Sequence, residues 1–166
     1  MAEITFQGFP LHTTGDLPNV GAKAPDFNLV GVDLQPVNLT NFVGKKVILN
    51  IFPSVDTPTC SASVRRFNEL AAGKADTVVL CISKDLPFAH GRFCGSNGIK
   101  DVVSLSAFND DSFVANYPID IIDGPTRGLL ARAVVVLDSD HNIVHTQLVG
   151  ELADEPDYDK ALAALE

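Results

Sequence analysis

The chain has 166 residues, of which 46% are hydrophobic and 20% charged. This is the length and balance of one folded domain, and it excludes a disordered tail or a fibre. A chain of this length buries roughly 70% of its unfolded surface, so it needs no disulfides to complete a core. Acidic residues outnumber basic ones by 21 to 12, for a net charge of −9. That charge disfavours nucleic acids and anionic membranes as partners.

Neither a membrane span nor a secretory leader is predicted. The longest apolar runs, such as 134–137, are far shorter than the ~20 residues that cross a bilayer. The first residues read Met-Ala-Glu-Ile-Thr-Phe, with an acid where a leader carries basic residues. We therefore expect the protein in the cytoplasm.

The cysteines indicate neither a disulfide framework nor a metal site. There are three of them, an odd number, and none forms a Cys-x-x-Cys pair. The four histidines show no zinc-finger spacing to them, and we expect these histidines on the surface or in hairpin turns. We predict no metal and no other cofactor.

In chain order, the first predicted elements are strands. Alternating residues around Gly8 predict a hairpin over 4–12, followed by a Gly, Pro and Asp-rich loop over 15–26. Two short strands are expected over 27–32 and 37–39, as a second hairpin. The apolar run 46–52 is typical of a strand buried on both faces.

The middle of the chain then alternates helices and strands. Apolar residues at helical spacing predict a helix over 58–70, which Gly73 ends. A buried strand over 78–83, a helix over 87–96 and a strand over 102–105 complete a β-α-β-α-β pattern. This pattern predicts a partly parallel sheet covered by helices.

The last third is predicted as a loop, a hairpin and a helix. The loop covers 120–128, and a long strand over 130–138 turns into a second strand over 143–149. A helix over 156–165 closes the chain, with Asp154 as its cap. Without repeats or linkers, residues 1–166 are expected to form a single α/β domain.

The most informative residues lie where the strand 46–52 ends and the helix 58–70 begins. Thr57 suits the N-cap position and Pro58 the first helical position, which places Cys60 third in the helix. A thiolate there faces free backbone N–H groups and the positive end of the helix dipole. Cys60 is thus a candidate nucleophile, and the alternative is a buried, inert cysteine.

The segment Pro53-x-x-x-Thr57-x-x-Cys60 resembles the active-site motif of the peroxiredoxins. The segments 24–27 (Ala-Pro-Asp-Phe), 50–56, 85–88 (Asp-Leu-Pro-Phe) and 130–136, with the N-terminal hairpin, are similar to the thiol peroxidase subfamily. The resemblance covers the whole chain. It implies a thioredoxin-like fold, with a central mixed sheet flanked by helices and an N-terminal β-hairpin extension.

The resemblance also implies roles for individual residues. Cys60 would attack the peroxide and become a sulfenic acid. Pro53 would shield the thiolate, Thr57 would bind the peroxide, and Arg132 would stabilise the thiolate and the leaving oxygen. Arg132 is a lone charge in an apolar segment, and the alternative for it is a residue paired at the surface.

The other two cysteines receive different predictions. Cys94 matches the resolving cysteine of the subfamily, which forms an intramolecular disulfide with Cys60; the alternative is a packing residue among phenylalanines. Three glycines near Cys94 would make local unfolding of its helix easier: Gly91, Gly95 and Gly98. Cys81 lies in an apolar strand and is expected to be inert.

The leading hypothesis is an antioxidant thiol peroxidase that reduces hydrogen peroxide and organic hydroperoxides. The resemblance implies recycling by thioredoxin or a similar dithiol protein, and a homodimer, with Phe88 in the peroxide pocket or at the dimer face. The alternatives are a thiol–disulfide oxidoreductase, which the missing Cys-x-x-Cys disfavours, and a redox sensor or holdase switched by oxidation of Cys60.

Overall fold

The computed structural model describes residues 1–166. Nine strands are formed: β1 (Glu3–Phe6), β2 (Phe9–His12), β3 (Leu29–Gly31), β4 (Pro36–Val37), β5 (Lys46–Ile51), β6 (Thr77–Ser83), β7 (Val103–Ser106), β8 (Ala133–Leu137) and β9 (Ile143–Leu148). The helices are the 3₁₀ helix η1 (Leu39–Phe42) and α1 (Pro58–Ala71), α2 (Pro87–Asn97), α3 (Asp111–Asn116) and α4 (Tyr158–Ala163). No helix is both long and apolar enough to cross a bilayer.

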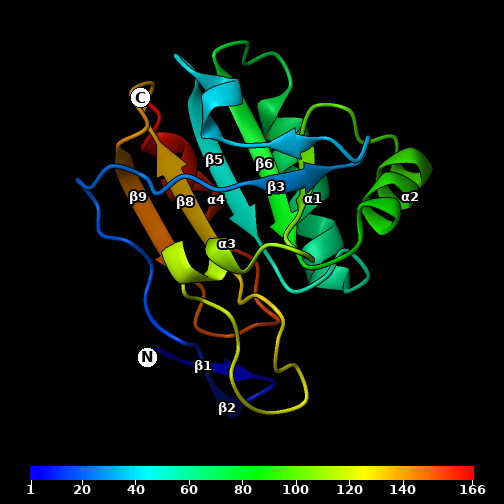
Figure 1. The fold of residues 1–166 in the computed structure, drawn as a ribbon, viewed down its shortest axis with the longest axis vertical. Helices are drawn as coiled ribbons and strands as arrows, with labels where there is room; N and C mark the ends of the chain where they lie inside the picture. The colour runs from blue at the N-terminus through cyan, green and yellow to red at the C-terminus, as the bar shows by residue number, and fades with distance from the viewer.

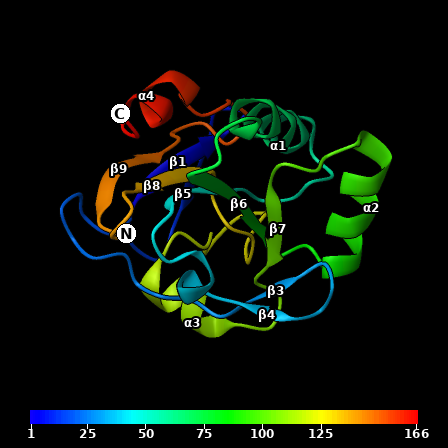
Figure 2. The same cartoon turned by 90° about the horizontal axis from the view of Figure 1, so that it is seen from above.

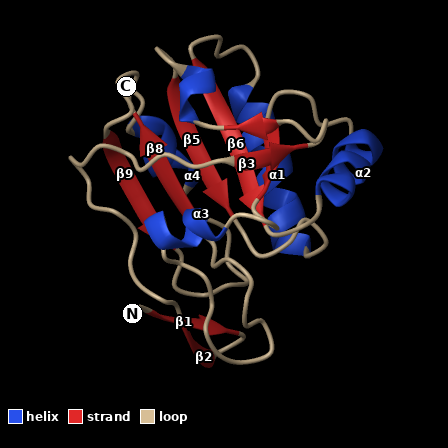
Figure 3. Ribbon diagram, in the orientation of Figure 1, coloured by secondary structure: helices blue, strands red, loops and turns tan.

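Seven strands form one mixed sheet in the order β4-β3-β7-β6-β5-β8-β9 (Figure 3). The neighbours β5, β6 and β7 are parallel, as the predicted β-α-β-α-β pattern requires. The remaining pairs are antiparallel. The prediction of a central mixed sheet flanked by helices is therefore confirmed.

Helices cover both faces of this sheet (Figure 2). Alternate side chains of β5 face opposite ways: Ile48 lies in a core with α1, α2 and α4, and Leu49 in a larger core on the α3 side. Burial of β5 on both faces explains its unbroken apolar sequence. The two cores fix the strand ends and hence the loops that follow them.

The predicted N-terminal hairpin forms beside the main sheet (Figure 1). Its turn residues Gln7 and Gly8 have φ values of 51° and 84°, the left-handed backbone that two-residue hairpin turns need. Thr5 pairs with Glu151 and Thr13 with Ile121, each through an isolated bridge. Two distant loops of the chain therefore hold the hairpin.

Some predicted boundaries are wrong. The helix α4 is capped by Asp157, whose side chain accepts from the Lys160 N–H, and not by Asp154. The strand expected over 37–39 ends at Val37, because Asn38 caps the 3₁₀ helix that follows. The strand expected from residue 130 begins at Ala133. The short helix α3 was not predicted at all.

Candidate active site

The loop between β5 and α1 places Cys60 in the first turn of α1. Thr57 is the N-cap and Pro58 the first helical residue, as predicted. The Thr57 hydroxyl oxygen accepts the Cys60 N–H at 3.2 Å and donates to the Ser54 carbonyl at 3.2 Å. These bonds fix the third helical position, where Cys60 lies near the positive end of the helix.

Cys60 is buried against a buried arginine. Its exposed fraction is 0%, and that of Arg132 is 1%. Nη2 of Arg132 donates to the Cys60 Sγ at 3.3 Å and to the Leu152 carbonyl at 2.9 Å, and Nε donates to the same carbonyl at 3.1 Å. Nη1 is buried without a hydrogen-bond partner. Arg132 is therefore not a surface-paired residue.

The guanidinium gives the thiol an electropositive environment. The Arg132 cation lies in contact with the sulfur, near the positive end of the α1 dipole. Since both side chains are shielded from water, their attraction is screened less than it would be at the surface. The arrangement is chemically suited to nucleophilic attack by sulfur.

A cavity of about 400 Å³ opens beside this pair. Thr57 and Arg132, which both contact Cys60, line it together with the buried Pro53. The remaining lining comes from the hairpin turn, the first turn of α1 and two loops: Phe6, Gln7, Asp56, Pro58, Thr59, Thr126, Leu129, Leu152 and Ala153. The structure thus brings four of the five predicted site residues together.

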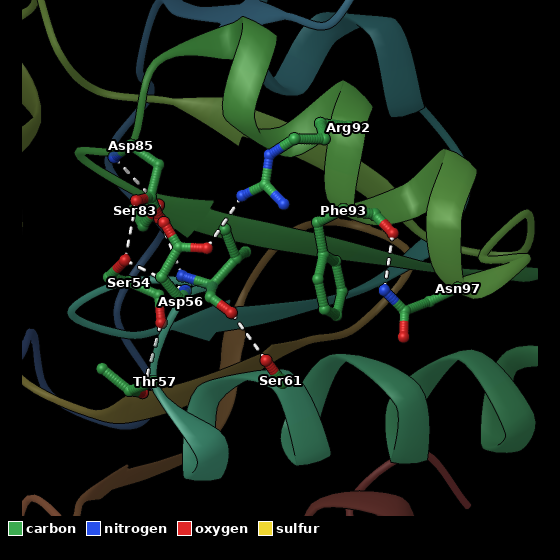
Figure 4. Close-up of polar contacts among 10 residues, drawn as sticks. Ser54, Asp56, Thr57, Ser61, Ser83, Asp85, Arg92, Phe93 and Asn97 are labelled. Atoms are coloured by element: carbon green, nitrogen blue, oxygen red, sulfur yellow. Dashed lines mark hydrogen bonds and ion pairs between the residues drawn. The ribbon is translucent and has the colours of Figure 1, made fainter.

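Asp85 holds the loop that leads to Cys60 (Figure 4). Its carboxylate accepts from the Ser54 hydroxyl at 2.8 Å, the Val55 N–H at 2.8 Å and the Ser83 hydroxyl at 2.6 Å. The sequence alone did not predict this role of Asp85. The available signal was its place after β6, because the carboxyl ends of the parallel strands β5 and β6 converge at one edge.

His90 is a correction to the prediction that all histidines lie on the surface or in turns. It is fully buried in α2, and its Nε2 lies 3.0 Å from the Ser83 hydroxyl. Burial lowers the pKa of His90 below its ordinary value of 6.5, against a smaller opposing effect of Asp85. Its ring lies edge-on to Phe52, and the hydrogen bond with Ser83 partners Nε2 inside the protein.

Cys94 lies in separate surroundings from Cys60. It is half-buried on α2, its Sγ is 3.3 Å from the Ser104 hydroxyl, and it lines a different cavity of about 400 Å³ next to β3 and β7. All three cysteines are free thiols. The structure therefore does not bring Cys94 to the Cys60 site.

The remaining residues singled out in the sequence are Cys81 and Phe88. Cys81 is buried in β6, and burial raises the pKa of its thiol to about 12. At neutral pH almost none of it is thiolate, as expected of an inert cysteine. Phe88 is 67% exposed and does not line the cavity beside Cys60.

Comparison with known proteins places this geometry in a family. Residues 19–162 match the Redoxin family. The chain is 55% identical to the thiol peroxidases of Mycobacterium tuberculosis and Mycobacterium bovis over 165 residues, 99% of each chain. A peroxiredoxin-like protein from Aquifex aeolicus superposes with a TM-score of 0.89 at 34% identity, covering 98% of this chain and 95% of that one.

A thiol peroxidase from Chromobacterium violaceum, 20% identical, shares the fold with a TM-score of 0.90, over 98% of this chain and 95% of its own. The predicted thioredoxin-like fold is thereby confirmed. The chain belongs to the Redoxin family and, within it, to the thiol peroxidase group of the peroxiredoxins, enzymes that reduce peroxides with a thiol.

Proposed function

We propose that Cys60 is the thiol that reduces the peroxide. Its thiolate attacks the terminal oxygen of a hydroperoxide, so that an S–O bond forms as the O–O bond breaks. The leaving oxygen departs as water or an alcohol after taking up a proton, and Cys60 becomes a sulfenic acid. The observation that carries this proposal is the contact between Arg132 and Cys60 in the first turn of α1.

Three neighbours of Cys60 support the reaction in this proposal. Arg132 stabilises the thiolate through Nη2, while its unpartnered Nη1 is free to donate to a peroxide oxygen. The Thr57 hydroxyl lines the cavity and positions the peroxide. Pro53 is buried at the cavity wall and shields the sulfur from water.

We propose further that Cys94 resolves the sulfenic acid. Its thiol attacks the Cys60 sulfur, water leaves, and a Cys60–Cys94 disulfide forms. Since the two cysteines lie in different surroundings, α2 must open locally before their Cα atoms come within the ~7 Å that a disulfide allows. Gly91 and Gly95 favour such opening because glycine inside a helix weakens it, whereas Gly98 caps the end of α2 in the left-handed conformation.

A thioredoxin-type dithiol protein returns two electrons to this disulfide and restores both thiols. Such a cycle suits a reducing compartment, so we place the protein in the cytoplasm.

We also infer a homodimer, as the resemblance implies, and one domain over residues 1–166. The hairpin supports the single domain, because its strands are bonded to residues 121 and 151 of the main body.

The test is peptide mapping by mass spectrometry after one equivalent of hydrogen peroxide is added to the reduced protein. We expect a linked Cys60–Cys94 peptide with Cys81 still free. Cys60→Ser should abolish peroxide turnover, while the matched variant Cys81→Ser should keep it. Full turnover by Cys60→Ser would overturn the proposal, and a linkage to Cys81 would overturn the role of Cys94.

A further inference from the structure

The tip of the hairpin turn, Gln7 and Gly8, is exposed, whereas Phe6 before it packs against the larger core. Phe6 and Gln7 line the cavity beside Arg132 and also line a second cavity, of about 500 Å³, on the side of Phe9 and Gly124. Open space on two sides leaves few packing contacts to hold this exposed tip. Hydrogen bonds must therefore set its position.

Those hydrogen bonds converge on one carboxylate, that of Glu151. It accepts from the Gln7 N–H at 2.7 Å and the Gly8 N–H at 3.3 Å, both in the turn. It also accepts the Thr5 hydroxyl at 2.5 Å and the Ala153 N–H at 3.2 Å. Hydrogen bonds to an ionised acceptor are about twice as strong as neutral ones.

Apart from the bond of the Thr5 hydroxyl, the rest of the hairpin is held without the Glu151 side chain. The Thr5 N–H donates to the Gly150 carbonyl at 2.8 Å, and the Leu152 N–H donates to the Thr5 carbonyl at 2.7 Å. These backbone bonds fix Leu152, whose carbonyl holds Arg132. The Glu151 carboxylate thus governs the turn, whereas the backbone governs the part of the site next to Cys60.

We propose that Glu151 is a positioning residue that holds Phe6 and Gln7 as the outer wall of the active-site cavity. This inference rests on the proposed function. The wall comes from the hairpin, whereas Thr57 and Arg132 are the lining residues that contact Cys60; in this proposal the organic group of a hydroperoxide lies against the wall. Hydrogen peroxide has no such group, so its reduction does not depend on the turn.

The carboxylate keeps this role over a wide pH range. The Thr5 hydroxyl and the Gln7 N–H, with smaller contributions from Ala153 and Gly8, lower the pKa of Glu151 to about 2. Glu151 is therefore ionised wherever the protein would be assayed, and the wall should not loosen on mild acidification.

The test compares Glu151→Gln with the matched variant Glu155→Gln, which removes the same charge nearby from a residue bonded only to Tyr158. We expect Glu151→Gln to lower kcat/KM for cumene hydroperoxide by about tenfold, chiefly through KM, with less than a twofold change for hydrogen peroxide. Glu155→Gln should change neither. Equal losses for both peroxides, or no loss for either, would overturn the proposal.

Hydrogen exchange supplies a measurement that does not depend on turnover. In Glu151→Gln the amides of Gln7 and Gly8 should exchange faster, while those of Thr5 and Leu152 stay protected. Unchanged exchange at Gln7 and Gly8 would count against Glu151 even if the kinetics changed. If the unmodified protein reduces neither peroxide, the proposed function fails, and the exchange measurement still decides whether Glu151 holds the turn.

Discussion

At the scale of single residues, His90 is a buried base whose second nitrogen has no partner. The Ser83 hydroxyl donates its one hydrogen to Asp85, so it can only accept from the His90 Nε2–H. The other nitrogen, Nδ1, is then the unprotonated one, and it is buried without a hydrogen-bond partner. Protonation would place a new N–H there with nothing to accept it.

His90 should therefore make the protein less stable in mild acid. Its pKa is lower in the folded state than the ordinary value of 6.5, which describes the unfolded chain. The stability that neutral His90 supports is complete above pH 6.5 and is lost as the pH falls from there through the folded pKa. The melting temperature should thus fall between pH 7.5 and 5.5, by about 2–4 °C for each kcal/mol lost.

The measurement is thermal unfolding of the reduced protein and of His90→Gln at both pH values. The fall should be smaller in His90→Gln, because glutamine does not titrate. His12 and His145, which also titrate with shifted pKa values, are present in both proteins, so the difference isolates His90. An identical fall in both proteins would show that His90 does not contribute.

A site residue can be predicted from the sequence when the residues that fix its position lie close to it in the chain. Cys60 and its capping residues lie within four positions, so helix geometry alone predicted their arrangement, and it is confirmed. Asp85 and Glu151 were missed because the bonds that give them these roles, from the Val55 and Gln7 N–H groups, join residues 30 and 144 positions apart. Neither a periodic pattern nor a short motif indicates a contact between residues so far apart in the chain.

The same reasoning holds for whole elements. β5 and α1 are long and strongly patterned, and the sequence predicted each to within a residue or two. The helix α3 has only six residues, too few to repeat a helical pattern twice. Its cap, Asp110, followed by Asp111, also resembles a turn. The packing of its buried residue Phe113 helps to fix α3, and a single sequence does not display that packing.

The element that must move in the proposed cycle is α2, and an ion pair ties it to the active-site loop. Arg92 of α2 donates to the Asp56 carboxylate at 2.9 Å (Figure 4). Both side chains are mostly exposed, and such pairs contribute at most about 1 kcal/mol. Since 1.4 kcal/mol corresponds to a factor of ten, loss of the pair should raise the open population of α2 up to about fivefold.

Arg92→Ala should consequently form the Cys60–Cys94 disulfide faster and be less readily overoxidised at Cys60. Stopped-flow measurement of disulfide formation and mass spectrometry after excess peroxide would report the two effects. The matched variant is Arg66→Ala, which breaks an exposed pair with Glu69 within α1. If Arg66→Ala gives the same acceleration, the ion pair to Asp56 is not the cause.

On the scale of the whole molecule, three large apolar side chains remain exposed on two linked segments, which follow β6 and β7. Leu86 and Phe88 are 49% and 67% exposed, and Phe108 is 48% exposed. The Ser106 hydroxyl joins their segments, because it donates to the Asp85 carbonyl and accepts the Phe108 N–H. Clustered exposed aromatic groups are typical of protein interfaces. We expect this surface to form the contact between the two copies of the proposed homodimer.

Phe88→Glu should weaken that dimer, because it would place a charge on each side of a contact between apolar groups. Light scattering coupled to size-exclusion chromatography should show a dimer for the unaltered protein and a monomer for Phe88→Glu at low micromolar concentration. Val43→Glu is the matched control, because Val43 is 77% exposed and follows the separate helix η1. That variant should stay dimeric. A dimer that survives Phe88→Glu but not Val43→Glu would place the interface elsewhere, and an unaltered protein that is monomeric would refute the dimer itself.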